Sequence, residues 1–227
     1  TEGCVKIKDT ATVSATGSNG IAISATGGGA NVTVSGGTVS ASDSIGIAIY
    51  AAGAVSNVTV SGGMVSATGG GTAIFATGGG ATVTVSGDAT ISGRTAISTA
   101  GSVLVKDSGT VSATGSYGIA IFATGGGSTV TVSGGTVTGA GAGYDNPVIY
   151  MYGTPINAAT VNVTVSGSGK VEATANNGVA INTGGSAEIK DSGTVSASGS
   201  SGCAILATGA SSTVTVSGGT VFASRKD

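Results

Sequence analysis

Apolar and polar positions alternate along this chain in short runs, and glycine ends most of these runs. In residues 130–137 (Val-Thr-Val-Ser-Gly-Gly-Thr-Val), valine alternates with threonine on each side of a Ser-Gly-Gly turn. Because successive side chains of a strand point to opposite faces, this alternation predicts half-buried β-strands. No segment shows the 3.6-residue periodicity of an amphipathic helix, so we expect an all-β protein.

The same phrase recurs along the whole chain. Its equivalents begin at Val5, Val32, Val58, Val83, Val103, Val130, Val163, Ala187 and Val214. Successive starts are 20 to 33 residues apart and average about 26. A period of this length is typical of solenoids and is too short for a propeller blade, which needs ~40 residues.

Each repeat has room for three short strands. In the second repeat we expect strands at residues 32–34, 38–41 and 47–51, separated by turns rich in Gly, Ser and Ala. The parity expected to face inwards is Val32, Val34, Val39, Ile47 and Ile49. The parallel crossovers that join such strands are strongly right-handed. The sequence therefore predicts a right-handed, three-sided parallel β-helix of about nine coils, a single domain over residues 1–227.

One coil is longer than the rest, and neither end carries an amphipathic cap. Residues 139–159 are expected to form an inserted loop that holds both prolines and three tyrosines, Tyr144, Tyr150 and Tyr152. A long loop on a rigid scaffold often carries recognition, although a tolerated insertion explains it equally well. Because solenoids normally cap their open ends, we expect this chain to be a segment of a longer repetitive protein.

The outward positions of the first two strands form columns of hydroxyl side chains. The most regular part of these columns is Thr90, Ser92, Thr110, Ser112, Thr136 and Thr138. Parallel hydroxyl columns on a flat face resemble the Thr-x-Thr arrays of ice-binding solenoids. Thr and Ser are also ordinary residues for any exposed sheet. Met64 and the pair Lys170 and Glu172 interrupt the columns.

The third strand is expected to present an apolar face. Its second position is alanine in most coils, which we expect to point outwards together with the residue two places on: Ala22, Ala48, Ala73, Ala96, Ala120, Ala180 and Ala204. The large apolar side chains of that next outward position are Tyr50, Phe75, Phe122 and Leu206. Exposed apolar stripes often mark contact surfaces. Lateral packing against another protein chain or against itself is the preferred use, with stacking on surface glycans as a second use and a merely apolar face as the alternative.

Composition and charge narrow the range of partners. Charged residues make up 8% of the chain, the formal net charge is −2, and the eight Lys and Arg residues are scattered along the sequence. Nucleic-acid binding needs a basic stripe, so no such partner is expected. No apolar run approaches the ~18 residues that cross a bilayer, and no membrane insertion is expected.

No catalytic, metal-binding or cofactor-binding constellation is apparent. Glycoside hydrolysis needs two carboxylates about 5–10 Å apart, whereas Glu172, Glu188 and Asp191 fall on different strands or turns with lysines nearby. The chain has no histidine, and its glycine runs are not followed by the Gly-Lys-Ser/Thr of a phosphate loop. We expect no enzyme and no cofactor. Because right-handed β-helices include polysaccharide lyases and hydrolases, a polysaccharide-binding or polysaccharide-degrading β-helix remains an alternative.

The phrases TVTVSGGTV (residues 129–137) and GIAIFATGGG (residues 118–127) carry a family resemblance. They resemble the repeats of very large secreted or wall-anchored surface proteins of Gram-positive bacteria, which chain such phrases into long, adhesin-like β-solenoids. The resemblance runs from Val5 to Ala223. It implies an extracellular or cell-surface location and a structural or adhesive role, and it supplies no functional residues.

Overall fold

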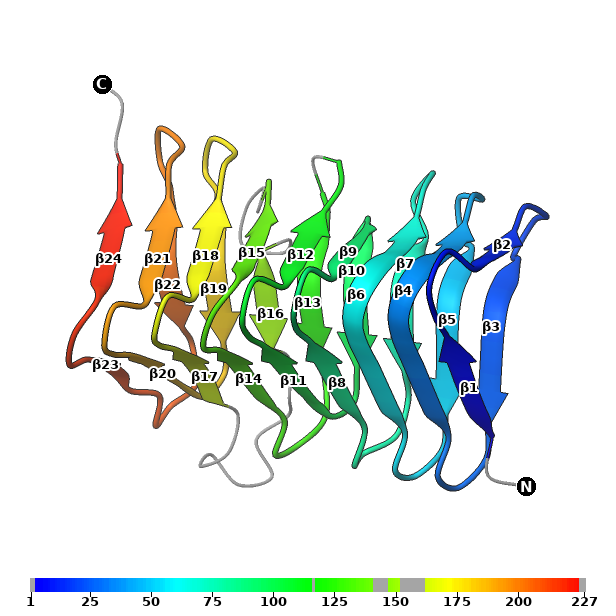
Figure 1. Cartoon of the computed structure of the whole chain (residues 1–227). Coiled ribbons are helices and arrows are strands. Elements are labelled where there is room, and N and C mark those ends of the chain that lie inside the picture. The colour runs from blue at the N-terminus through cyan, green and yellow to red at the C-terminus, as the bar shows by residue number, and fades with distance from the viewer. Residues whose placement is uncertain (1–2, 116, 141–146, 152–161, 225–227) are drawn as a thin grey trace.

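The chain folds into a parallel β-solenoid (Figure 1). The computed structural model describes residues 3–115, 117–140, 147–151 and 162–224, and these contain strands and no helix. Each strand pairs in parallel with its equivalents in the neighbouring coils. In Figure 1 the coils follow one another from right to left, with the front strands running upwards and the rear strands downwards. That arrangement is a right-handed coil, and the predicted fold class is confirmed.

Every coil repeats the same order of three strands. The first strands are β1 (Cys4–Ile7), the first parts of β4 (Asn31–Ala41) and β6 (Asn57–Ala67), then β8 (Thr82–Val85), β11 (Ser102–Val105), β14 (Thr129–Val132), β17 (Asn162–Val165), β20 (Ser186–Ile189) and β23 (Val214–Val216). The second strands are β2 (Thr12–Ala15), the later parts of β4 and β6, then β9 (Thr90–Gly93), β12 (Thr110–Ala113), β15 (Thr136–Gly139), β18 (Lys170–Ala173), β21 (Thr194–Ala197) and β24 (Thr220–Ala223). The third strands are β3 (Ile21–Thr26), β5 (Ile47–Ala52), β7 (Thr72–Ala76), β10 (Thr95–Thr99), β13 (Ile119–Ala123), β16 (Ile149–Met151), β19 (Val179–Thr183) and β22 (Cys203–Ala207). The described residues thus form eight complete turns, and a ninth coil adds its first two strands.

The coil has three sides but only two hydrogen-bonded sheets. In β4 and β6 the chain stays in one strand through the corner between the first and second sides, with register shifts around Ser35. These two strands join both sides into a single 16-stranded sheet, while the third strands form a separate 8-stranded sheet. Alternation along each strand predicts three sides, but it does not indicate that the first corner is shallow enough to keep the two sides in one sheet.

Columns of β-branched side chains fill the inside of the solenoid. The 8-stranded sheet contributes one column of isoleucines that are fully buried: Ile49, Ile74, Ile97, Ile121, Ile149 and Ile181. Burying a side chain of this size contributes about 1.5–3 kcal/mol. Most of that burial comes from the coils above and below, so the stability of each coil depends on its neighbours.

The alanine of the third strand points into the core, contrary to the expectation that it faces outwards. Ala48 and its equivalents Ala73, Ala96, Ala120 and Ala180 are fully buried, and Ala204 nearly so. Ile47, expected inside, is half-buried instead. The register pairs Ile47 with Thr72 and Ile49 with Ile74 and skips the alanine between them. The chain bends round the second corner here, so two successive residues face the interior and strict alternation fails.

Buried threonines close the tight turns of the two shortest coils. Where most coils place alanine at the end of the third strand, coils four and seven carry Thr99 and Thr183, both at most 2% exposed. The Thr99 hydroxyl accepts a hydrogen bond from the Gly101 amide at 2.9 Å, and Thr183 does the same for Gly185 at 3.0 Å. This local bond satisfies a backbone donor where the turn has only two residues.

Two kinds of first corner, an aspartate corner and a Ser-Gly-Gly corner, follow one another in a fixed order. In coils one, five and eight an aspartate takes a left-handed backbone conformation, namely Asp9, Asp107 and Asp191, with φ of 57° to 58°. The next coil always has a Ser-Gly-Gly corner whose first glycine lies on that aspartate: Gly36, Gly134 and Gly218. A Cβ on any of these glycines would come within 2.7 to 2.8 Å of the aspartate carbonyl oxygen. The coil that follows an aspartate corner therefore requires glycine at the position that lies on the aspartate.

The corner geometry predicts a large difference between two glycine-to-alanine substitutions. Gly135 has φ +68°, and a Cβ there would collide with the Gly109 carbonyl oxygen of the preceding coil. Gly126 lies in an open turn with nothing within 4 Å of such a Cβ. We expect Gly135→Ala to lower the free energy of unfolding by about 2 kcal/mol or more, and Gly126→Ala to change it by less than about 0.5 kcal/mol. Urea denaturation followed by far-UV circular dichroism measures both, and equal midpoints would contradict the corner geometry.

Candidate functional site

The outward residues of the 8-stranded sheet form one continuous column. The strand register places them in direct succession as Ser24, Tyr50, Phe75, Ser98, Phe122, Tyr150, Asn182 and Leu206. We call this set the aromatic column. Its strands are the downward arrows at the rear of Figure 1. The column includes all four residues of the interaction face expected from sequence, and it adds Tyr150.

The rings of the aromatic column lie in two pairs. Tyr50 and Phe75 have ring centroids 5.8 Å apart with planes inclined by 28°, and Phe122 and Tyr150 are 5.6 Å apart at 36°. Ser98 separates the two pairs. All four rings are half-buried, so each keeps part of its surface open to a partner. Contacts between such pairs contribute about 0.5–1.5 kcal/mol each, which holds the rings in register as two small platforms.

Tyr150 belongs to this column rather than to a loop. The segment expected as an insertion at 139–159 contains β16, so Ile149–Met151 continue the 8-stranded sheet. The spacing of the first strands does not reveal this third strand, because the coil that contains it is 33 residues long. A local signal is present: in all four ring-bearing strands the aromatic directly follows isoleucine, as in Ile121-Phe122 and Ile149-Tyr150. Tyr144 and Tyr152 lie outside the described residues.

The hydroxyl columns are aligned as the sequence indicates, but over a short length. The register pairs Thr90 with Thr110 and Thr136, and it pairs Ser92 with Ser112 and Thr138. Met64, which is 41% exposed, stands before this ladder in the preceding coil. In the coil after it, Lys170 and Glu172 form an ion pair of 2.7 Å. Uninterrupted pairs of hydroxyls therefore extend over three coils.

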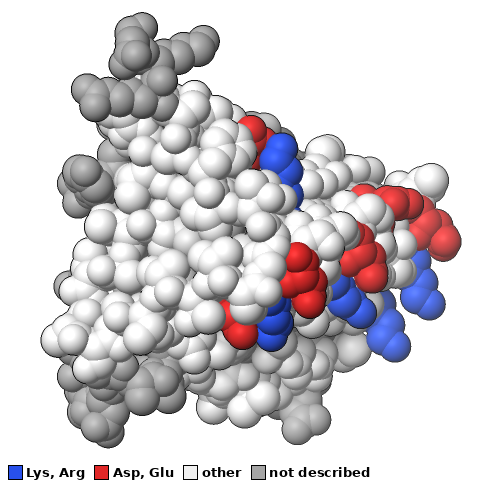
Figure 2. Space-filling view, turned by 90° about the vertical axis from the view of Figure 1, so that its left-hand side faces the viewer, with Lys and Arg blue, Asp and Glu red and all other residues white. Residues whose placement is uncertain are grey.

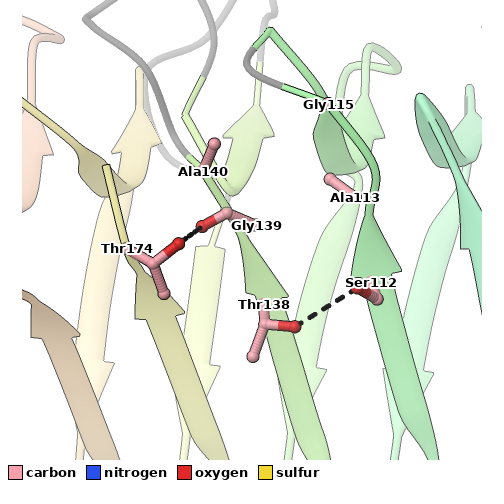
Figure 3. Close-up of a pocket in the computed structure, with 7 residues that line it drawn as sticks. All are labelled: Ser112, Ala113, Gly115, Thr138, Gly139, Ala140 and Thr174. Atoms are coloured by element: carbon pink, nitrogen blue, oxygen red, sulfur yellow. Dashed lines mark hydrogen bonds between the residues drawn. The ribbon is translucent and has the colours of Figure 1, made fainter. Parts of the chain in front are cut away.

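A depression beside this ladder is lined by small residues (Figure 3). It has a volume of about 440 Å³ and is lined by Ser112, Ala113, Gly115, Thr138, Gly139, Ala140 and Thr174. The Thr138 hydroxyl donates a hydrogen bond to Ser112 Oγ at 3.5 Å, and the Thr174 hydroxyl donates one to the Gly139 carbonyl at 3.3 Å. The lining residues are all un-ionisable, so they supply no group for acid–base catalysis.

Stacking of the coils gathers charged side chains that the sequence scatters. Figure 2 views the C-terminal end of the solenoid, where the blue and red atoms lie mostly on one side. Those on the 16-stranded sheet and its corner are Lys6, Lys8, Asp9, Asp88, Lys106, Asp107, Lys170, Glu172, Glu188, Lys190 and Asp191. The two signs are interleaved, as in the pair between Lys190 and Glu188 at 3.1 Å. This edge is therefore a mixed ladder and offers no basic stripe for a nucleic acid.

Within the described part of the chain, potential metal ligands do not cluster. No set of three or more His, Cys, Asp or Glu residues there could hold a metal ion. Cys4 and Cys203 are free thiols and lie in the first and eighth coils. Nor do these residues contain a helix of the length and hydropathy that crossing a membrane requires.

Comparison of this chain with known protein families, with curated proteins and with solved structures gave no match. The structure establishes the class of the protein, a repetitive parallel β-solenoid. The resemblance to Gram-positive surface proteins stays a prediction.

One carboxylate has a shifted pKa, and it fastens two neighbouring turns. The Asn19 amide donates a hydrogen bond to Asp43 Oδ2 at 2.8 Å, from the turn of the preceding coil. This bond, followed by one from the Ser44 amide, lowers the pKa of Asp43. Hydrogen bonds to the charged form stabilise it, so the ionised carboxylate favours the folded state.

The Asp43 contact predicts a pH-dependent effect on stability. Because its pKa is lowered on folding, the carboxylate stabilises the fold above its unfolded pKa of about 3.9, and this contribution disappears as pH falls through the folded value. We expect Asp43→Asn to be less stable than the unmodified protein at pH 7. The difference should narrow below about pH 4. Urea midpoints from pH 7 down to pH 2 measure it; a difference that does not change with pH would show that the charge is not involved.

Proposed function

We propose that this chain is a non-catalytic segment of an extracellular or cell-surface protein, a rigid rod that contacts a protein or glycan surface through its aromatic column. The observation that carries the proposal is the pair of two-ring platforms, Tyr50 with Phe75 and Phe122 with Tyr150. They lie on one sheet at the regular spacing of the coils. Such a surface can make the same weak contact several times along its length.

The contrast between the sides of the solenoid supports this proposal. The first and second sides present hydroxyls and paired charges, which keep their water and gain little on association. The third side presents half-buried rings and Leu206. Burial of the rest of a large ring contributes on the order of 1–2 kcal/mol, so two platforms suffice for a weak but repeated contact.

A role in polysaccharide degradation has less support. The described glutamates are each ion-paired with a lysine of the same strand or its end, Glu172 with Lys170 and Glu188 with Lys190. The charge of each carboxylate is thus offset by a neighbouring lysine rather than directed at an opposing carboxylate across a cleft. The proposal therefore keeps the chain as a binding or structural element.

Ice binding is a second candidate, favoured by the register of the hydroxyl ladder. Thr110 and Ser112 lie in the middle coil of the three, with hydroxyl residues on both sides. Three coils at ~4.8 Å spacing give a face only about 10 Å long. The ion pair of Lys170 with Glu172 ends it. We rank this candidate below the aromatic contact because the ordered surface is so short.

The aromatic contact predicts loss of association when the rings are removed. Replacing Tyr50, Phe75, Phe122 and Tyr150 together with Ser should preserve the β-sheet circular dichroism spectrum, because these residues lie outside the core. It should abolish concentration-dependent self-association in sedimentation velocity, or retention on a glycan array. The double variant Met64→Ser with Phe222→Ser removes two exposed apolar side chains from the second side and serves as control. If the control loses association equally, or the ring variant keeps it, the aromatic column is not the contact surface.

The ranking of the ice candidate predicts that the protein does not arrest ice growth. We expect no thermal hysteresis and no inhibition of recrystallisation at micromolar concentration. Activity that Thr110→Lys removes and that Thr131→Lys, on the first side, leaves unchanged would reverse the ranking. In that case the hydroxyl ladder would be the functional surface.

A further inference from the structure

The fourth coil leaves a notch in the row of turns that joins the second strands to the third strands. Its turn is a single residue, Arg94, between the end of β9 and the start of β10. The preceding coil uses residues 68–71 for the same turn, and the following coil uses residues 114–118. In Figure 1 the turn between β9 and β10 accordingly ends below the turns on either side of it.

The notch is a defined cavity, and hydrogen bonds to the next coil hold the backbone at Arg94. Its volume is about 270 Å³, and its lining residues are Gly69, Gly70, Arg94, Thr114, Gly115 and Tyr117. The Ile119 amide donates a hydrogen bond to the Arg94 carbonyl at 2.8 Å, and the Thr114 amide donates one to the Gly93 carbonyl at 2.8 Å. Stacking between coils thus holds the backbone of Arg94 in place while its exposed side chain reaches into the notch.

The notch carries one uncompensated positive charge. Arg94 forms no ion pair with any described residue, and none of the lining residues is acidic. The other described cations lie on the 16-stranded sheet or its corner, away from this row of turns: Lys6, Lys8, Lys106, Lys170 and Lys190. In the same row of turns Asp43 bonds to the Asn19 amide, two coils before Arg94. The guanidinium is therefore free to bind an anion from outside.

The lining fits a carboxylate carried on a small ring. A guanidinium presents paired N–H donors that match the two oxygens of a carboxylate. Tyr117 is 64% exposed and supplies an aromatic surface on the same cavity. The glycines keep the opposite wall free of side chains. The volume is slightly below the ~300–1,000 Å³ of pockets for drug-sized ligands, which leaves room for a single sugar ring.

We propose that this notch binds a uronic-acid residue of an acidic polysaccharide. Arg94 holds the carboxylate, and Tyr117 packs against the sugar ring. The site lies on the turns and not on the aromatic column, so it goes beyond the proposed contact and does not depend on it. A chain of such sugars could run along the edge of the solenoid from this one charged anchor.

The test is a titration of the ¹⁵N-labelled protein with trigalacturonic acid, followed by NMR. We expect amide shifts confined to the notch, at Gly69, Gly70 and Tyr117, with a dissociation constant in the millimolar range. Arg94→Gln should weaken binding at least about tenfold, because it removes the charge-assisted hydrogen bonds. The fully methyl-esterified trisaccharide keeps the rings and loses the charge. It should bind the unmodified protein no more tightly than trigalacturonic acid binds the Arg94→Gln variant.

Two control variants distinguish binding in the notch from binding elsewhere on the solenoid. Lys106→Gln removes a cation from the mixed ladder and should leave binding unchanged, as should replacing the four rings of the aromatic column by Ser. Equal binding of the methyl ester, equal binding by Arg94→Gln, or the absence of shifts in the notch would each overturn the proposal. Tighter binding of a Glu-containing tripeptide than of the trisaccharide would also overturn it, in favour of an acidic protein segment.

Discussion

Everything in this protein depends on the in-register, parallel hydrogen bonding of each coil to the next. A single coil is too thin to bury its own side chains; Ile121, for example, is fully buried only because Ile97 and Ile149 lie directly below and above it. The same register that aligns the core also aligns whatever lies outside. The ring pairs, the hydroxyl ladder and the mixed ladder of charges are therefore consequences of one constraint, since a residue type repeated in sequence becomes a column in space.

Much of the fold follows from the sequence because two periods act together: the two-residue alternation within each strand and the recurrence of the same phrase in every coil. Alternation within strands predicts which valines face inwards, and Val58, Val60 and Val65 are fully buried as expected. The predictions fail where the chain changes direction. Ala48 lies at a corner, where two successive residues point inwards and the two-residue period does not apply. Tyr150 is expected in a loop because counting from the first strands cannot place a third strand in a coil of unusual length. The shallow first corner, which joins two sides into one sheet, depends on backbone geometry that composition does not reveal.

The candidate sites arise where the repeat departs from uniformity. The core tolerates little variation, since a change in one coil must fit both neighbours. Outward positions and turns are free of that requirement. The outward position of the third strand accepts Ser98 beside Phe122, and the turns between second and third strands include both the single residue Arg94 and the five residues 114–118. A uniform scaffold with variable edges is the arrangement in which recognition is usually found.

The fixed succession of an aspartate corner by a Ser-Gly-Gly corner gives the repeat a direction. A coil with an aspartate corner, such as the one that contains Asp107, leaves no space for a side chain on the residue that lies over it, which is Gly134. A Ser-Gly-Gly coil also leaves no space for a side chain above its corner, where Gly63, Gly87 or Gly167 lies, but the corners that carry these glycines are of more than one kind. When repeats are gained or lost by recombination, an aspartate coil can therefore be copied only where its glycine successor is copied with it or is already in place. At these points the unit that duplication can copy is a pair of coils, although the structure repeats with every single coil.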